Sequence, residues 1–333
     1  MVGKQQRKTT LIGVACLLLL VATLLSIGLG SVRLTLQETV LTLIGQGESA
    51  NHTILWDIRI PRVFLALLIG ANLAASGALL QAVMQNPLAD PGLTGVSSGA
   101  AVAVLFILLV LPSYSSMVPL AAIVGGAGAA AMVYIWAWKR RSGFAPIRVI
   151  LSGVAVNAVF GGGIGLLTIL YSDKLPAALQ WMNGSLSGKG MSGVLVILPY
   201  SIIGWIAAFL CIRQANILRL GEQAAHNLGQ NLTRIRVTLS FIAVYLAAIS
   251  VSSVGLVGFV GLVVPHIARM LIGSDYRQML PLSLVMGALI LLIADTLGRT
   301  AFAPLEIPSG IVMAMVGGPY FLYLMRKGDG ARA

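Results

Sequence analysis

Charged residues are scarce in this chain. Asp, Glu, Lys and Arg together make up 10% of its 333 residues, whereas soluble domains carry about a quarter. Hydrophobic residues make up 58%, and a soluble fold of this length cannot bury so much apolar surface. The composition therefore excludes an ordinary soluble domain and indicates a protein that lies in a membrane.

Residues that bind metals are also few, and they are not spaced as ligand sets. The cysteines, Cys16 and Cys211, lie in or at the edge of apolar stretches, which is typical of packing residues. The histidines, His52, His226 and His266, show no metal-binding spacing. The sequence therefore predicts neither a disulfide framework nor a metal site, and no cofactor is expected.

Motifs for catalysis are missing as well. Gly188-Lys189-Gly190 lacks the upstream glycine and the hydroxyl residue of a nucleotide-binding loop, so ATP hydrolysis is expected on a separate polypeptide. No H-E-x-x-H, paired aspartates or serine–histidine set occurs, so we do not expect an enzyme. An ion-coupled secondary transporter stays as the alternative, although it would need several carboxylates within spans and only Asp295 comes close.

Long apolar stretches take up most of the chain. Helices of about 18 or more residues cross a hydrocarbon core of ~30 Å, and no strand-like alternation indicates a barrel. We predict an all-α polytopic membrane protein, a single transmembrane domain over residues 1–333 that keeps its first apolar stretch. About ten transmembrane helices are expected, near residues 11–31, 62–83, 93–111, 117–138, 147–170, 193–212, 237–255, 260–272, 280–298 and 309–325.

The basic residues lie at the ends of these stretches and form no single stripe. Despite the formal net charge of +12, this distribution does not favour a nucleic-acid partner. With the N-terminus inside, six of the 22 Lys and Arg residues fall on the outer side and the remaining sixteen on the cytoplasmic side, as the positive-inside rule expects. An even number of spans then places both termini in the cytoplasm. The six outer residues are Arg33, Arg59, Arg62, Lys174, Lys189 and Arg299.

Two apolar segments contain glycine and proline that break the helical pattern. They are residues 86–92 and 255–265, and the order of the spans puts them on opposite membrane faces. Paired interruptions of this kind are typical of inverted repeats with a path between two halves. Small residues also cluster at 125–129 and 161–165, where we expect close helix packing or contact with that path.

A long polar stretch, residues 213–236, lies on the expected cytoplasmic side. Its pattern predicts two short helices separated by Gly229, with one apolar and one polar face. A helix pair outside the bilayer suits docking into a groove on a soluble partner. An ordinary interfacial loop would have the same pattern, so both interpretations stay open at this point.

A series of short motifs occurs in a specific order between residues 56 and 324. Taken together, they resemble the permease family that includes the cobalamin and ferric-siderophore ABC importers. Each motif is weak alone, and the order and spacing carry the resemblance. The motifs are RIPR at 59–62, GALLQ at 77–81, NPLADP at 86–91, GVSSGA at 95–100, FVGLVVPHIAR at 259–269, DTLGR at 295–299 and EIP at 306–308.

The resemblance implies an architecture and a set of partners. It implies the type II ABC importer permease fold in the cytoplasmic (inner) membrane, surrounded by membrane lipid, with ten spans per subunit. Two permease subunits, identical or different, would enclose one path, with two cytoplasmic ATPase subunits and an extracytoplasmic substrate-binding protein. The cargo would be a metal chelate, with ferric siderophore favoured over cobalamin or haem.

The resemblance also assigns roles at the outer face. Arg59, Arg62 and Arg299 resemble arginines that meet glutamates on the two lobes of the binding protein, and guanidinium groups suit bidentate pairing with carboxylates. The alternative is that they anchor helix ends at the headgroups. Asp295 lies four residues before Arg299, so a helical ion pair between them is expected.

On the cytoplasmic side the resemblance indicates two further groups of residues. Glu222, Ala225 and Gly229 echo the Glu-Ala-Ala…Gly loop by which ABC permeases engage their ATPases. The nearby Leu218 and Gly221 are assigned to the same coupling segment.

Asn86 and Leu88 resemble a cytoplasmic constriction of the path, and Gln81 is assigned to the path beside them. The family's companion constriction uses small hydroxyl residues just before the fifth span. This chain has Pro146 and Ile147 there, so a second constriction is not predicted with the same chemistry.

Overall fold

The computed structural model describes residues 2–32, 34–138, 145–221, 225, 227 and 229–329, and within these ranges it contains helices and no strands. The α-helices are α1 (Val2–Gly28), α2 (Leu36–Leu43), α3 (Ser49–His52), α4 (Ile60–Met84), α5 (Val96–Leu105), α6 (Val118–Ala137), α7 (Pro146–Leu170), α8 (Leu175–Met182), α9 (Met191–Leu210), α10 (Ile212–Leu218), α12 (Leu232–Val254), α13 (Val260–Ile272), α14 (Tyr276–Thr300) and α15 (Ser309–Asp329). Short π-helical or 3₁₀ turns lie at Thr53–Arg59, Pro91–Thr94, Phe106–Val110, Pro112–Met117 and Ser172–Lys174.

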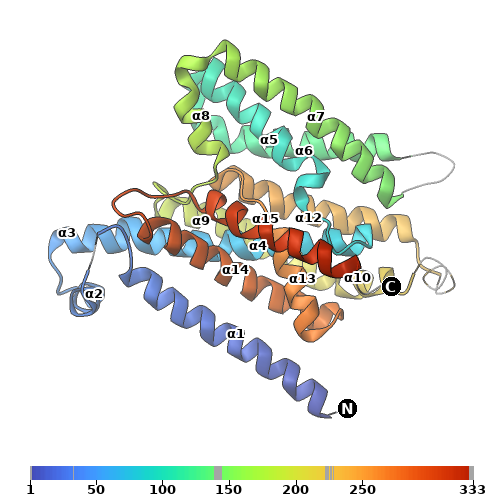
Figure 1. The fold of residues 1–333 in the computed structure, drawn as a ribbon, viewed down its shortest axis with the longest axis horizontal. Helices are drawn as coiled ribbons and strands as arrows, with labels where there is room; N and C mark the ends of the chain where they lie inside the picture. Colours follow the sequence, from blue (N-terminus) through green and yellow to red (C-terminus); the bar gives the residue numbers. More distant parts are fainter. Residues whose placement is uncertain are drawn as a thin grey trace.

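The helices confirm the all-α membrane fold. Seven helices in the described part of the chain are long and apolar enough to cross a membrane. Three shorter apolar helices, Val96–Val110, Val260–Ile272 and Ser309–Tyr323, coincide with the remaining expected spans. α1 begins and α15 ends at the same end of the molecule (Figure 1), as an even number of crossings requires.

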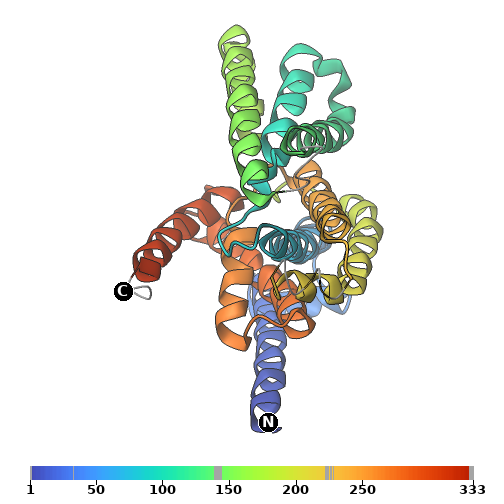
Figure 2. The same cartoon turned by 90° about the vertical axis from the view of Figure 1, so that its right-hand side faces the viewer.

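α4 is the central helix of one group, in which α9, α12, α13 and α14 pack around it (Figure 2). It is apolar on all sides, which is the pattern of a fully buried helix, and nearly all of its residues are buried. Glycines allow its close contacts. A Cβ atom at Gly70 would overlap the backbone of Gly287 in α14, and one at Gly77 would overlap the backbone of Gly261 in α13.

The helices α5, α6, α7 and α8 form a second group above the first in Figure 1. Gly99 of α5 and Gly125 of α6 meet backbone to backbone, so Gly125 has the packing role expected for small residues. Glycines in the 161–165 cluster of α7 differ. Side chains added at Gly161, Gly162 or Gly165 would meet nothing within 4 Å, which leaves this face of α7 uncovered by the described chain.

Both expected interruptions of the helical pattern are confirmed. Residues 85–90 separate α4 from the 3₁₀ turn that leads into α5, and residues 255–259 separate α12 from α13. Each break contains a non-glycine residue with a positive φ angle, Gln85 at 50° and Phe259 at 67°. Such backbone is uncommon outside glycine, and it reverses the chain so that a short helix starts inside the bundle.

Candidate functional site

The three arginines expected at the outer face come together at one end of the helical bundle. Arg59 ends the π-helical turn before α4, Arg62 lies in the first turn of α4, and Arg299 lies in the last turn of α14. Their exposed fractions are 4%, 4% and 2%. In this conformation all three guanidinium groups have partners within the chain, and their role in docking stays a prediction.

Arg59 and Arg299 bind the carboxyl end of α1, where a helix leaves its last carbonyl groups unpaired. Arg59 Nη1 donates to the carbonyls of Ile27 at 3.0 Å and Gly28 at 2.7 Å. Arg299 donates through Nη1 to the carbonyl of Leu29 at 2.6 Å and through Nη2 to that of Ser26 at 2.5 Å. Cations are favoured at this end of the helix dipole, so Arg59 and Arg299 stabilise the carboxyl end of α1.

Arg62 joins two carboxylates at the other side of this cluster. Its Nε donates to Asp295 Oδ2 at 2.9 Å and to Oδ1 at 3.0 Å, and its Nη1 contacts Glu306 Oε2 at 2.6 Å. Asp295 Oδ2 also lies 3.5 Å from Arg299 Nε, which confirms the expected i, i+4 ion pair. Asp295 is thus a buried carboxylate between two guanidinium groups, as a structural counter-ion requires.

Glu306 is the solvent-facing member of the cluster, with 32% of its side chain exposed. Burial alone would raise the pKa of Glu306, but the hydrogen bond and charge of Arg62, helped by the hydroxyls of Ser31 and Ser187, hold it below the ordinary value. Glu306 was not singled out from the sequence beyond its place in the EIP motif. A carboxylate on a loop between two spans was the available signal.

A second polar cluster lies at the opposite end of α4. Gln81 is buried; its Oε1 accepts from Arg269 Nη2 at 2.8 Å and its Nε2 donates to the carbonyl of Leu262 at 3.2 Å. The same amide lies 3.5 Å from the carbonyl of Gly261. Pro265 has no N–H, so the carbonyl of Gly261 loses its normal helical partner. Gln81 therefore ties α4 to α13 at this proline.

The loop at residues 85–90 is attached to the expected coupling segment. Gln85 Nε2 donates to the carbonyl of Leu218 at 2.7 Å. Asn86 Oδ1 accepts from the amide of Leu88 at 2.9 Å, an Asx turn that holds the loop. Asn86 and Leu88 are both half-buried. Gln85, which the sequence did not single out, is the link between the two regions.

The coupling segment is fastened to α14 as well. Asn216 Oδ1 accepts from the amide of Tyr276 at 3.0 Å, and its Nδ2 donates to Asp275 Oδ1 at 2.8 Å. Burial alone would raise the pKa of Asp275, but the amide of Arg277, the side chain of Asn216 and nearby cationic groups hold it below the ordinary value. These contacts connect α10 rigidly to the start of α14.

Within the coupling segment the expected residues differ in their surroundings. Leu218 and Ala225 are fully buried, so they pack the segment against the protein. Gly221 and Gly229 have φ angles of 89° and 67°, which favour glycine. Glu222 lies outside the described residues. The chain after Gly229 enters α12 at Leu232, so a separate second short helix there was a wrong expectation.

A cavity of about 400 Å³ lies between this segment and the 85–90 loop. Its lining is partly polar and includes Gln81, Gln85, Asn86, Arg219, Arg269 and Tyr276. Asn86 of the constriction and Gly221 of the coupling segment therefore lie around one cavity. On the α7 side, the helix begins at Pro146, and Ile147 is 60% exposed in the described chain.

A model of the FecCD transport family matches residues 18–327. The chain belongs to the FecCD transport family. The resemblance seen in the motifs is therefore confirmed, and the clusters at both ends of α4 are formed largely by those motifs of this FecCD chain.

Known proteins similar to this FecCD chain cover nearly its whole length. The Fe(3+)-citrate import system permease protein YfmE of Bacillus subtilis is 39% identical over 324 residues, which are 97% of this chain and 96% of that protein. The hemin transport system permease protein HmuU of Yersinia pestis is 38% identical over 330 residues, 95% of each chain. A solved structure described as an inward-facing conformation of a metal-chelate type ABC transporter superposes with a TM-score of 0.84 at 28% identity, covering 96% of this chain and 99% of that one.

Proposed function

We propose that the chain is the membrane-spanning subunit of a binding-protein-dependent ABC importer that carries a metal chelate, with a ferric siderophore as the favoured cargo. The observation that carries the proposal is the full-length match to permeases named for ferric citrate and hemin, together with the close structural likeness to a metal-chelate type transporter. The cargoes in these names share a chelated metal ion, which defines the cargo class.

ATP hydrolysis belongs to separate subunits in this proposal. The chain has no nucleotide-binding loop. In a complex of two permeases and two ATPases, the segment around residues 213–229 of each permease offers a docking surface for one ATPase. The buried side chains of Leu218 and Ala225 pack this segment against the core of the protein. Leu220, which is 58% exposed, is a side chain that reaches a partner.

Movement of that segment would reach the constriction through Gln85. Gln85 donates a hydrogen bond to the carbonyl of Leu218 in the coupling segment, and it directly precedes Asn86 in the chain. Gln81, Asn86 and Leu88 would then form the cytoplasmic end of the path, opened or closed as the ATPases move α10 against α4. This movement depends on the Gln85–Leu218 contact and needs no titratable group inside the membrane.

The outer arginines dock the binding protein by exchange of partners. Arg62 is occupied by Glu306, the exposed carboxylate of the cluster, so an incoming glutamate would replace Glu306 on Arg62. Arg59 and Arg299 position this site by fixing α1. In this arrangement the chain lies in the cytoplasmic membrane with both termini in the cytoplasm, as the distribution of basic residues predicts.

Reconstitution tests the proposal directly. Proteoliposomes with this chain, its ATPase and its binding protein should take up a ferric siderophore only with ATP, and should prefer it to haem or cobalamin. Uptake that follows an ion gradient without the ATPase would overturn the proposal in favour of a secondary transporter. Glu306→Gln should strengthen capture of the binding protein at low salt, with the exposed Glu48→Gln as the matched control.

A further inference from the structure

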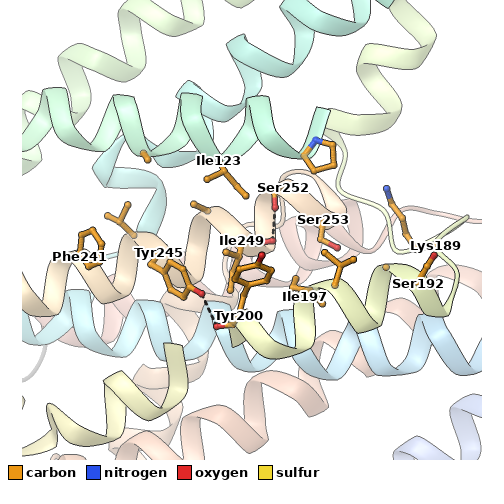
Figure 3. Close-up of a pocket in the computed structure, with 16 residues that line it drawn as sticks. Ile123, Lys189, Ser192, Ile197, Tyr200, Phe241, Tyr245, Ile249, Ser252 and Ser253 are labelled. Carbon is orange, nitrogen blue, oxygen red and sulfur yellow. Dashed lines mark hydrogen bonds between the residues drawn. The ribbon is translucent and has the colours of Figure 1, made fainter. Parts of the chain in front are cut away.

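A membrane-facing groove on the other side of the molecule from α7 has no role in the function proposed above. It has a volume of about 580 Å³ and runs between α6, α9 and α12 (Figure 3). Its walls are mainly apolar, with Ile123 from α6, Val196 and Ile197 from α9, and Phe241, Val244 and Ile249 from α12. All three helices are membrane spans, so the groove opens toward lipid.

The groove has one charged end. Lys189 and Ser192 lie together there, whereas Phe241 lies at the other end (Figure 3). The lysine is exposed, and no described carboxylate forms an ion pair with it. α9 begins at Met191, and Gly190 before it supplies no side-chain cap, so the partial positive charge of this helix end adds to that of the lysine.

The inner part of the groove has few unpaired polar groups. Tyr245 Oη donates to the carbonyl of Tyr200 at 3.0 Å, and Ser252 Oγ donates to the carbonyl of Ile249 at 2.9 Å. Since these two hydroxyls bond backbone carbonyls, the middle of the groove offers mainly apolar surface. One cation at the edge of the bilayer and an apolar channel behind it match an amphiphile with an anionic head.

We propose that this groove binds one phospholipid with an anionic headgroup, its phosphate at Lys189 and an acyl chain between α6, α9 and α12. The apolar part supplies no preference among lipids, because an acyl chain leaves one apolar medium for another. It does require an occupant, since an empty groove forfeits dispersion contacts. Selectivity comes from Lys189, and one lysine at a membrane surface gives about a five-fold preference for an anionic over a zwitterionic headgroup.

The test starts from the protein with its co-purifying subunits in nanodiscs of phosphatidylethanolamine and phosphatidylglycerol. The protein is purified from these nanodiscs, and the lipid that stays bound to it is analysed. Wild type should retain phosphatidylglycerol, enriched about five-fold over the bulk mixture. Lys189→Gln should keep a bound lipid and lose the enrichment, and Ala127→Phe should lose the lipid because it fills the groove from α6. Unchanged enrichment in Lys189→Gln, or unchanged bound lipid in Ala127→Phe, would overturn the proposal.

Matched controls separate this site from general effects. Lys174→Gln removes an outer lysine that bonds the carbonyl of Leu109 outside the groove, and Ala131→Phe enlarges an exposed alanine one turn further along α6; both should behave as wild type. A second copy of the chain is the competing occupant. Ile123→Cys in a background of Cys16→Ser and Cys211→Ser should give no disulfide-linked dimer in membranes, and efficient linkage would reject the lipid. These outcomes do not depend on which cargo is imported.

Discussion

Asp295 shows at the residue scale how a membrane protein keeps charge inside its core. It lies between Arg62 and Arg299, and each arginine has further partners, so every charge in the cluster has an opposite charge or a carbonyl nearby. A buried ion pair adds little net stability compared with apolar packing, but removal of one partner leaves an uncompensated charge. The cluster therefore holds α1, α4 and α14 together, and removal of one of its charges should destabilise the fold.

Replacing Asp295 should thus be costly. Asp295→Asn leaves two buried guanidinium groups without their shared counter-ion, and we expect a loss of roughly 3–5 kcal/mol in the free energy of unfolding. Thermal unfolding in detergent measures it, with the exposed Asp173→Asn as the control. A melting temperature equal to that of wild type would contradict the counter-ion role.

Glu306 should make stability depend on pH. Because its folded pKa is held below the ordinary 4.5, its contribution is complete above that pH and is lost as the pH falls through the folded pKa. Glu306→Gln should remove this component, so the difference in melting temperature between wild type and variant should shrink on acidification below about pH 4.5. A difference that stays constant from pH 7 to pH 3 would exclude the Arg62–Glu306 pair as the cause.

At the scale of elements, Gln85 joins the end of α4 to the end of α10. Gln85→Ala removes a single hydrogen bond, worth about 1 kcal/mol, so the fold should persist. We expect transport per ATP hydrolysed to fall several-fold while ATPase binding is unchanged. Coupled uptake and hydrolysis in proteoliposomes provide the measurement, and the exposed Gln37→Ala serves as control. Normal coupling in Gln85→Ala would show that the constriction moves by another route.

The contact of α4 with α13 depends on the absence of a side chain at Gly77. Gly77→Ala should force the two helices apart and lower stability by about 1–3 kcal/mol, the range for overpacked cores. Gly128→Ala on α6 is the matched control, because a Cβ there meets nothing within 4 Å. The two variants are compared by size-exclusion chromatography after heating, which measures the ratio of folded to aggregated protein. Equal loss in both variants would point to a general glycine effect.

At the scale of the whole molecule, the uncovered face of α7 indicates where a second permease subunit would lie. The small residues Gly161, Gly162 and Gly165 permit close approach of another helix. Gly165→Cys in a cysteine-free background should form a disulfide-linked dimer in membranes, whereas Ala131→Cys on α6 should not. Linkage at Ala131 but not at Gly165 would place the subunit contact on the opposite side.

The sequence by itself determined the membrane fold, the positions of the spans and their two interruptions. Span length, glycine and proline breaks, and the order of the motifs depend on residues that are near each other in the chain, so they are readable without coordinates. The family was also readable, because its motifs are short and ordered.

Only the tertiary structure decided what the polar residues of those motifs contact. Arg59 and Arg299 bind carbonyls of α1, and Arg62 binds Glu306, across roughly thirty to 270 positions of sequence. In the sequence alone, an arginine near a span end that faces water cannot be distinguished from one that caps a distant helix. Which of the two occurs depends on how α1, α4 and α14 pack, and that packing follows from backbone contacts such as Gly70 with Gly287.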